Sequence, residues 1–322
     1  MIYFEEAQEE ESQLTAYYFS GGMGMRGSLP GSTRRPVVTY ALIAVNVLIW
    51  LAMEFEGRSR GGSESPEVLL QFGAMYGPLI AAGEYWRLFT AMFLHVGLLH
   101  LAFNGFGLLI FGRIVEGIYG PVRFSLIYVL AGLFGSVASY LLNSVSIGAG
   151  ASGAIFGVLG ALAAFFLVRR EMLGEVGRQN LTGLAVIAAI NLVFGFSQPG
   201  IDNWAHMGGL VAGFALGMAL APNYRLVDDV FGMGGRLVNV NSLARSFWVV
   251  PVAVALLFGA TLLGNSRMPD AQSHIDKAEQ HMQEGDFEAS LSELRAALEV
   301  ATRNRDAEAI ANVSALFERL RR

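Results

Sequence analysis

Residues 151–168 read ASGAIFGVLGALAAFFLV and contain no charged side chain. An α-helix needs about 20 mostly apolar residues to cross the hydrocarbon core of a bilayer. This run is therefore typical of a membrane-spanning helix, and it decides the class of fold. The whole chain agrees, because 53% of its 322 residues are hydrophobic and 15% are charged, with a mean hydropathy of +0.46. Such a composition is too apolar for a soluble globule of this size.

Uncharged runs of similar length recur on both sides of this segment. Seven spans are predicted, near residues 37–53, 96–115, 124–142, 151–168, 181–198, 203–221 and 247–264. The second span has an alternative, from Leu88 to Gly112, because its apolar run begins at Leu88. We therefore expect an all-α membrane protein with a six-helix core at 37–221 and one additional transmembrane helix at 247–264.

The segments outside these spans are polar. Residues 1–36 contain a cluster of glutamates and lack the basic and apolar regions of a signal peptide, so we expect a soluble tail there. A linker is expected at 222–246. Residues 270–322 are charged and favour two amphipathic helices joined at Gly285-Asp286, a soluble helical hairpin that resembles one tetratricopeptide unit. A solvated hairpin and a protein-binding repeat both fit this pattern.

Basic residues in short loops indicate the orientation of membrane proteins. Arg34 and Arg35 precede the first span, whereas the loops at 143–150 and 199–202 contain no basic residue. We expect a multi-pass protein of a bacterial cell membrane, with a cytoplasmic N-terminus and linker. The loop at 54–95 and the tail after residue 265 would then lie outside.

Composition also excludes several chemistries. The chain has no cysteine, which rules out disulfides, iron–sulfur clusters, thiolate zinc sites and a cysteine nucleophile. The net charge of -5 is not the basic balance of a nucleic-acid binder. No nucleotide-binding loop is evident, and we expect neither a cofactor nor a metal. Any protein nucleophile must therefore be an oxygen atom.

A few polar side chains interrupt the apolar spans. Strongly polar groups in a membrane helix cost on the order of 2.5–3.5 kcal/mol on insertion scales, so they need a reason to be there. They lie toward the predicted outer ends of three separate spans, and they are His95, His100, Asn104, Ser152 and His206. This convergence predicts a single pocket that opens outward. His100 and Asn104 are four residues apart and share one helix face.

Ser152 and His206 form a candidate catalytic pair. Ser152 follows Gly150 at a predicted helix start, and His206 lies on the same face as Gly209 and Gly213. Small residues at this spacing allow two membrane helices to approach closely, and an imidazole is a natural general base for a serine hydroxyl. Either residue alone is more often only a hydrogen-bonding group. Asp202 is expected to cap its helix rather than to act on His206.

These residues resemble the motifs of the rhomboid family of intramembrane serine proteases, over about residues 69–221. Four motifs occur in the family's order, and they are Trp86-Arg87, the HVGLLHLAFN segment with His95, His100 and Asn104, the Gly150-Ala151-Ser152-Gly153 element, and Ala205-His206 followed by Gly209 and Gly213. One such motif alone would be weak; four in order are specific.

The resemblance implies roles for individual residues. Ser152 would attack the scissile carbonyl, with His206 as base and then acid. The oxyanion would be stabilised by His100, Asn104 and the backbone N–H groups of Ser152 and Gly150. The remaining motif residues would be supporting or structural, and they are Gly153, Phe156 beside the catalytic histidine, Gly209, Gly213, His95, Trp86, Arg87, and Glu116 with Gly120.

The expected function is hydrolysis of peptide bonds in or near transmembrane segments of membrane-protein substrates. Two other readings remain open at this stage. A catalytically silent relative would bind membrane clients without cutting them, although the retention of both Ser152 and His206 argues against it. A transporter or channel would use His100, Asn104 and His206 as a polar pathway, but the inner halves of the spans contain few polar groups. The C-terminal hairpin is a candidate site for a protein partner.

Overall fold

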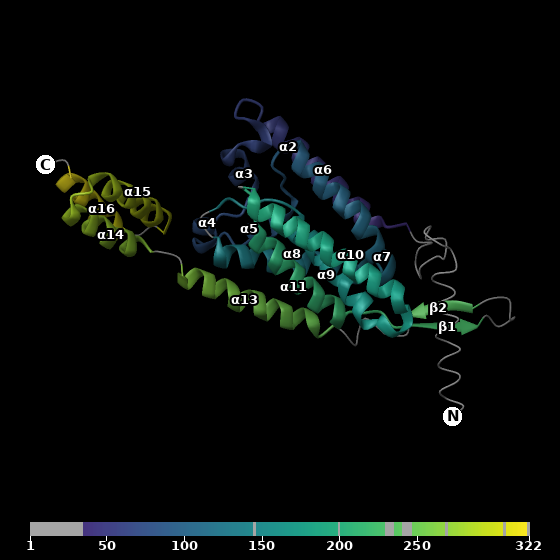
Figure 1. Ribbon diagram of the computed structural model, residues 1–322. Coiled ribbons are helices and arrows are strands. Elements are labelled where there is room, and N and C mark those ends of the chain that lie inside the picture. Colours follow the sequence, from purple (N-terminus) through teal and green to yellow (C-terminus); the bar gives the residue numbers. More distant parts are fainter. Residues whose placement is uncertain are drawn as a thin grey trace.

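The structure is a computed structural model that describes residues 35–143, 146–198, 200–228, 235–239, 247–267, 270–304 and 307–320. The predicted soluble tail at 1–36 lies almost entirely outside the described residues. The described chain is a bundle of helices with one short β-hairpin, β1 (Tyr224–Asp228) and β2 (Gly235–Asn239) (Figure 1). The predicted all-α membrane fold is confirmed.

Five of the described helices are long and apolar enough to cross a membrane. They are α2 (Val37–Glu56), the continuous run of α6 (Gly97–Gly107), the π-helical η3 (Leu108–Gly112) and α7 (Arg113–Tyr119), then α8 (Pro121–Leu142), most of α10 (Arg170–Ser197), and α13 (Val249–Arg267). The helices α9 (Ser152–Val168) and α11 (Asn203–Ala219) are shorter, with 17 residues each. Together they account for the seven predicted spans.

The second span begins at Gly97, so the alternative start at Leu88 is wrong. Leu88 belongs to the separate short helix α5 (Arg87–Thr90), which continues into η2 (Ala91–Phe93). Leu94 and Val96 are extended, and Gly97 has a φ of 70°, a left-handed conformation that favours glycine. This turn separates the apolar run into a loop part and a spanning part.

The outer loop between α2 and α6 contains short elements rather than an irregular chain. They are η1 (Gly62–Glu64), α3 (Pro66–Phe72), α4 (Gly77–Ala81), α5 and η2. They lie at one end of the bundle, and the β-hairpin lies at the other end (Figure 1). The hairpin falls within the segment at 222–246 that is predicted to be a linker.

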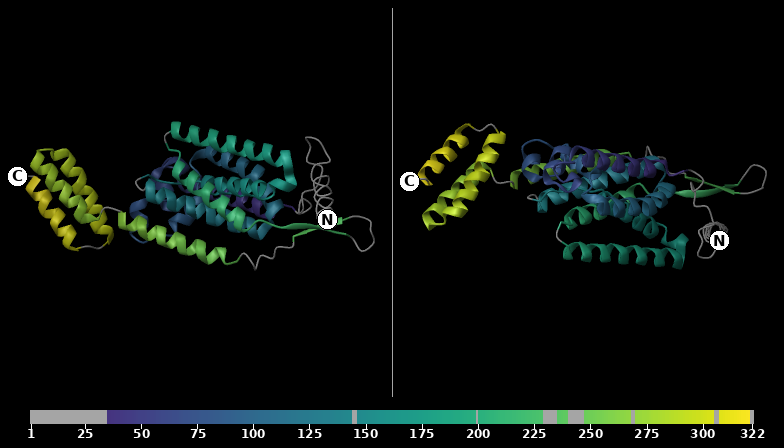
Figure 2. Two further views of the ribbon diagram at one scale, coloured as in Figure 1. Left: turned by 60° about the horizontal axis from the view of Figure 1, so that its bottom comes forward. Right: turned by 90° about the horizontal axis from the view of Figure 1, so that it is seen from above.

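The shorter helices α9 and α11 pack against each other, and α8 covers both. A Cβ atom added to Gly209 or Gly213 would collide with the carbonyl oxygen of Gly153 or Gly157. The predicted glycine stripes therefore do allow backbone-to-backbone contact. The helix α10 lies at the edge of the bundle in both views of Figure 2, and it contains a non-helical residue at Gly174.

The C-terminal segment contains three helices, so the predicted hairpin of two is incomplete. They are α14 (Ala271–Glu284), α15 (Phe287–Asn304) and α16 (Ala307–Leu320). They share a small core of their own that includes Ile275, Leu294 and Val313. This C-terminal unit lies beyond the end of α13, at the same end of the bundle as the outer loop (Figures 1 and 2).

Candidate active site

Ser152 and His206 meet at the end of the bundle that carries the loop between α2 and α6. Ser152 is the first residue of α9, and His206 lies in the first turn of α11. The serine Oγ and the histidine Nε2 are 2.8 Å apart, which is hydrogen-bond distance. The close packing of α9 on α11 places the two side chains together. The structure therefore brings together the pair that the sequence predicts, in a geometry that suits proton transfer from the hydroxyl to the ring.

The other ring nitrogen of His206, Nδ1, is buried and has no hydrogen-bond partner in the described part of the chain. Asp202 is occupied elsewhere. One of its carboxylate oxygens accepts the backbone N–H of Ala205 at 3.0 Å, and the other accepts the hydroxyl of Ser139. The predicted capping role of Asp202 is confirmed, since it begins α11. Asp202 therefore does not contact His206 Nδ1 in this structure.

Phe156 lies one turn along α9 from Ser152 and stacks on the ring of His206. The ring centroids are 4.4 Å apart and the planes differ by 8°. A stacked ring restricts rotation of the imidazole about its side-chain bonds, which holds Nε2 toward Ser152. Phe156 is 6% exposed and His206 is 8% exposed, so both rings are enclosed by the bundle.

His100 stands on the other side of Ser152, next to Gly150. Its Nδ1 accepts the backbone N–H of Val96 at 3.3 Å, so the neutral ring must carry its proton on Nε2. A Cβ atom added to Gly150 would lie 2.9 Å from this Nε2 and 3.6 Å from the Ser152 Oγ. The Nε2–H of His100 is thus a donor beside the nucleophile. Gly150 has a φ of 139° and leaves the space that the ring needs.

The backbone N–H of Gly150 is already engaged, because it donates to the carbonyl of Ala91 at 2.9 Å. The expectation that this N–H faces the oxyanion does not fit the structure as it stands. The role that the structure supports for Gly150 is to leave room for His100. Asn104 is buried, and its amide donates to the His100 carbonyl at 2.9 Å, so the two residues share one helix face as predicted.

Trp86 and Arg87 tie the outer loop together. The guanidinium of Arg87 pairs with Glu84 at 2.6 Å and donates to the carbonyls of Leu70 and Ala74 at 2.8 and 3.1 Å. It also lies 4.6 Å above the Trp86 ring. A buried arginine that makes three polar contacts, one with a carboxylate and two with carbonyl oxygens, stabilises the fold of the loop around it. These contacts stabilise the loop, and none of them involves Ser152 or His206.

His95 lies between η2 and α6 and is fully buried. Its ring packs edge-on against His100, with centroids 5.3 Å apart. Burial, helped by the neighbouring His100, lowers the pKa of His95 to about 3, so the ring is neutral at physiological pH. His95 therefore supports the ring of His100 without adding charge to the site.

Glu116 lies in α7, away from the serine and histidine. Its carboxylate accepts the backbone N–H groups of Val38 and Thr39 at 3.0 and 2.8 Å and the Thr39 hydroxyl at 2.7 Å. It thereby caps the first turn of α2, whose N–H groups have no partners within their own helix. No local pattern in the sequence indicates this pairing, because Thr39 and Glu116 are 77 residues apart.

Two further polar contacts went unpredicted. The Ser63 hydroxyl, in the outer loop, accepts the N–H of Gly97 at 3.1 Å and so caps α6. Asn265 on α13 bonds to the hydroxyls of Tyr85 and Tyr140. No local pattern in the sequence pairs a loop serine with a helix 34 residues away, so only the fold could reveal it. Asn265 lies one residue beyond the predicted seventh span, next to Ser266 and Arg267, so its position was no sign of a specific contact.

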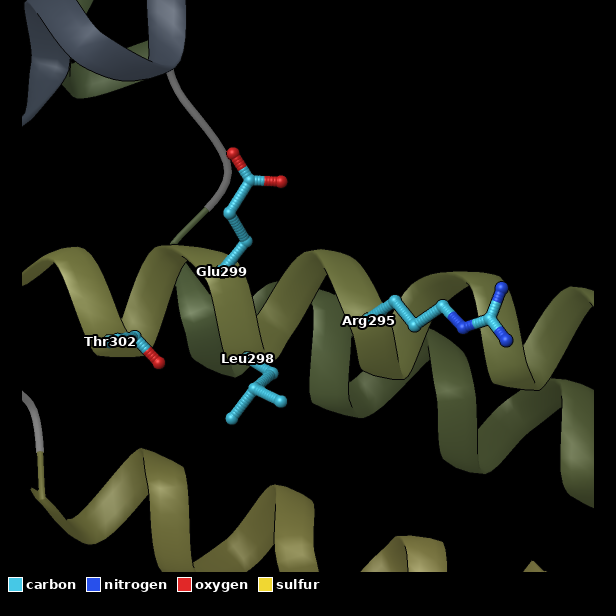
Figure 3. A pocket seen from close by; sticks show the side chains of 4 residues that line it. All are labelled: Arg295, Leu298, Glu299 and Thr302. Atoms are coloured by element: carbon cyan, nitrogen blue, oxygen red, sulfur yellow. The ribbon is translucent and has the colours of Figure 1, made fainter.

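Within the described residues, no group of three or more His, Asp or Glu lies close enough to hold a metal ion. A shallow surface pocket lies on α15, lined by Arg295, Leu298, Glu299 and Thr302 (Figure 3). It belongs to the C-terminal unit and shares no residue with the cluster around Ser152.

The chain is similar to known proteins over most of its length. A family model described as Rhomboid domain matches residues 82–223. The rhomboid protease GluP of Bacillus subtilis is 38% identical over 87% of this chain and 49% of its own length. RHOMBOID-like protein 6, mitochondrial, of Arabidopsis thaliana is 41% identical over 48% of this chain and 50% of its own. The chain thus spans about half the length of these two relatives.

A shorter relative is covered more completely. A protein named "Putative rhomboid protease YdcA", from Bacillus subtilis, is 32% identical over 56% of this chain and 86% of its own length. The region that the family model matches, residues 82–223, contains the four motifs and the helices that carry Ser152 and His206. On this similarity, the chain belongs to the rhomboid family.

Proposed function

We propose that this protein is an intramembrane serine endopeptidase that uses Ser152 and His206 to hydrolyse peptide bonds in or near transmembrane segments of other membrane proteins. The observation that carries the proposal is the 2.8 Å contact between the Ser152 Oγ and the His206 Nε2. It is supported by the family membership and by the similarity to GluP, a rhomboid protease of Bacillus subtilis.

In the proposed mechanism, the Ser152 Oγ attacks the scissile carbonyl carbon while its proton passes to His206 Nε2. The tetrahedral intermediate then collapses. The C–N bond breaks, and the departing amine takes the proton from Nε2, which leaves an acyl ester on Ser152. A water molecule next gives a proton to Nε2 and attacks the ester. The acid product leaves, and the proton returns to Ser152.

Negative charge develops on the carbonyl oxygen in both steps. The Nε2–H of His100, the side-chain amide of Asn104 and the backbone N–H of Ser152 are the proposed donors to it. The N–H of Gly150 would join them only after leaving the Ala91 carbonyl, to which it is bonded at 2.9 Å. His95 and Phe156 would hold the two catalytic-site histidines in place, while Trp86 and Arg87 fix the loop.

The proposed substrates follow from where the site lies. Ser152 and His206 are at the end of the bundle that bears the outer loop, at the starts of their helices. A substrate helix would have to extend locally there so that one peptide bond reaches the serine. With the N-terminus in the cytoplasm of a bacterial cell, this end would face outward, and cleavage would fall in the outer part of the substrate's span.

Protein binding by the C-terminal unit is a second, separate element of the proposal. The unit has its own small core and a surface pocket on α15, in which Leu298 and Thr302 project from the helix away from Glu299 (Figure 3). It stands at the same end of the bundle as the outer loop. A soluble partner or a substrate's soluble region would therefore meet it on the side of the active site.

The test is cleavage of a single-span reporter by purified protein in lipid bilayers. We expect the wild-type protein to cut, and Ser152→Ala and His206→Ala to fold normally but to be silent. Ser125→Ala is a matched control, because Ser125 is also a membrane-helix serine but donates only to the carbonyl of Pro121 at 2.9 Å. Equal cleavage by all four proteins would disprove the mechanism.

A silent binder of membrane clients would give a different result. It would capture the reporter without cutting it, and Ser152→Ala would not change the capture. A transporter would also leave the reporter intact. The two alternatives are thus separated from the protease by a single assay.

A further inference from the structure

The additional helix α13 packs along the core through one stripe of small and apolar residues. Val249, Ala253 and Leu257 recur at four-residue spacing and are 5–9% exposed. They lie against the core, where α13 contacts α8 and α4. The left view of Figure 2 shows α13 and α10 on opposite sides of the bundle. The stripe holds α13 along the membrane but leaves its outer end to be fixed by other contacts.

Two residues near the C-terminal end of α13 supply those contacts. Gly264 packs against the ring of Tyr140, so closely that a Cβ atom there would collide with the ring. The next residue is Asn265. Its side-chain oxygen accepts the Tyr140 hydroxyl at 2.6 Å, and its amide nitrogen donates to the Tyr85 hydroxyl at 2.8 Å. One amide therefore joins three segments, which are α13, the outer end of α8, and the outer loop.

A polar side chain in a membrane helix is costly unless it is paired, and Asn265 uses both ends of its amide. Tyr140 is 1% exposed, so its hydroxyl would be left without a partner if Asn265 were apolar. The contact at Tyr85 lies at the exposed side. The geometry is thus a specific bridge rather than general packing, since α13 could pack equally well through its apolar stripe without it.

Tyr85 connects the bridge to the catalytic residues. It immediately precedes Trp86 and Arg87, and α5 and η2 follow without a break as far as Phe93. Within that run the carbonyl of Ala91 accepts the N–H of Gly150 at 2.9 Å, two residues before Ser152. A displacement of Tyr85 would therefore be passed along a short, hydrogen-bonded segment to the turn that presents the nucleophile.

We propose that Asn265 is a positioning residue: through Tyr85 and Tyr140 it fixes the outer loop against α8, and so keeps the Ala91–Gly150 contact in register with Ser152. This rests on the proposed protease function. The additional helix is then part of the catalytic unit rather than only a carrier for the C-terminal unit. A displacement of the C-terminal unit would then also be transmitted to the outer loop through α13.

The experiment compares full-length wild type, Asn265→Leu and Tyr85→Phe in lipid bilayers with a single-span reporter. We expect Asn265→Leu to lower kcat by about threefold to tenfold, the loss of one or two average hydrogen bonds between membrane helices, with little change in KM. Tyr85→Phe should lower kcat by about threefold. The double variant should be no worse than Asn265→Leu alone, because both changes break the same bridge.

Hydrogen exchange provides a readout that does not depend on cleavage. Amides in residues 77–90 should exchange faster in Asn265→Leu than in wild type, because the loop loses its tie to α13. Ser266→Ala is the matched control, since Ser266 is the next residue on α13 and donates only within its own helix, to Leu263 at 2.9 Å. It should leave both kcat and exchange unchanged.

The outcomes separate this inference from the proposed function. Normal cleavage by wild type with unchanged kcat in Asn265→Leu would overturn the positioning role and leave the protease standing. Faster exchange with unchanged kcat would reduce Asn265 to a purely structural contact, which also overturns the inference. If the wild-type protein did not cleave the reporter, both the positioning role of Asn265 and the proposed protease function would be disproved. Should Asn265→Leu not fold, Tyr85→Phe decides, because it removes a single hydroxyl at the exposed side of the bridge.

Discussion

At the scale of single residues, the site depends on which atoms carry protons. The N–H of Val96 fixes the His100 proton on Nε2, beside Gly150 and Ser152. His206 has no described partner at Nδ1, so its orientation depends on Ser152 and on the stacked ring of Phe156. In the proposed mechanism, the two histidines thus have different tasks, His100 as a hydrogen-bond donor and His206 as a proton acceptor.

His100→Ala tests the donor. Removing one oxyanion-hole donor costs about a hundredfold to a thousandfold in kcat where this has been measured. We expect a loss of about a hundredfold in kcat, with a much smaller change in KM. Steady-state cleavage of a reporter with a single transmembrane helix would measure it. A change confined to KM would assign His100 to substrate binding instead.

Phe156→Leu tests the stacking. Leucine keeps an apolar group under the imidazole but removes the flat ring that restricts its rotation. We expect kcat to fall by about tenfold, as for a modest misplacement of a catalytic group. Phe156→Tyr keeps the ring and is the control. Equal kcat in wild type and Phe156→Leu would show that His206 is held by other contacts.

His95 gives a dependence on pH. Its folded-state pKa is about 3, below the ordinary value of 6.5, so the unfolded state binds a proton more readily. The stability that this ring contributes is complete above about pH 6.5 and is lost as the pH falls toward 3. Between pH 7 and pH 5 the loss is about 2 kcal/mol. Thermal unfolding in lipid should show a smaller dependence on pH in His95→Gln than in wild type.

At the scale of helices, the sequence was most informative where small residues repeat. The spacing of Gly209 and Gly213 predicted the contact of α11 with α9, and the structure shows it as backbone against backbone. The first prediction placed the start of the second span at residue 96, one residue from the start of α6. Hydropathy could not exclude the alternative start at Leu88, because Leu88 and Leu94 are as apolar as the helix that follows. The left-handed Gly97 ends the loop, and only backbone geometry reveals it.

Gly213→Leu tests the helix contact. The side chain would meet the carbonyl of Gly157, and overpacking of this kind typically costs about 1–3 kcal/mol. We expect a lower midpoint of thermal unfolding and a loss of activity larger than the loss of folded protein, because α11 carries His206. Gly259→Leu on α13 is the control, since a Cβ atom there would meet nothing within 4 Å. Equal effects of the two substitutions would contradict the account.

At the scale of the whole molecule, the long-range polar contacts were beyond prediction. Glu116 caps α2, Ser63 caps α6, and Asn265 joins α13 to the outer loop, each across a separation that local patterns do not encode. The family motifs, in contrast, allowed Ser152 and His206 to be paired from the sequence although they are 54 residues apart. The third helix of the C-terminal unit was missed because the tetratricopeptide pattern covers only two helices.

The packing of the whole molecule also explains why a partly buried serine should be reactive. The packing of α9 on α11, with α8 against both, places the Ser152 hydroxyl at hydrogen-bond distance from a ring nitrogen of His206. In the proposed mechanism, His100 donates a hydrogen bond to the oxyanion. A serine in an ordinary membrane helix, such as Ser125, bonds only to its own helix. Unusual nucleophilicity at Ser152 is therefore the central claim.

The most direct measurement is covalent capture by a fluorophosphonate, which forms a stable P–O bond only with an activated hydroxyl. The protein in lipid would be treated with the probe and then digested. The adduct would be located by mass spectrometry of the peptides. We predict a single adduct on Ser152 in wild type and Ser125→Ala, and none in His206→Ala. An adduct on another residue, or equal labelling of Ser152 in folded His206→Ala, would contradict the catalytic pair.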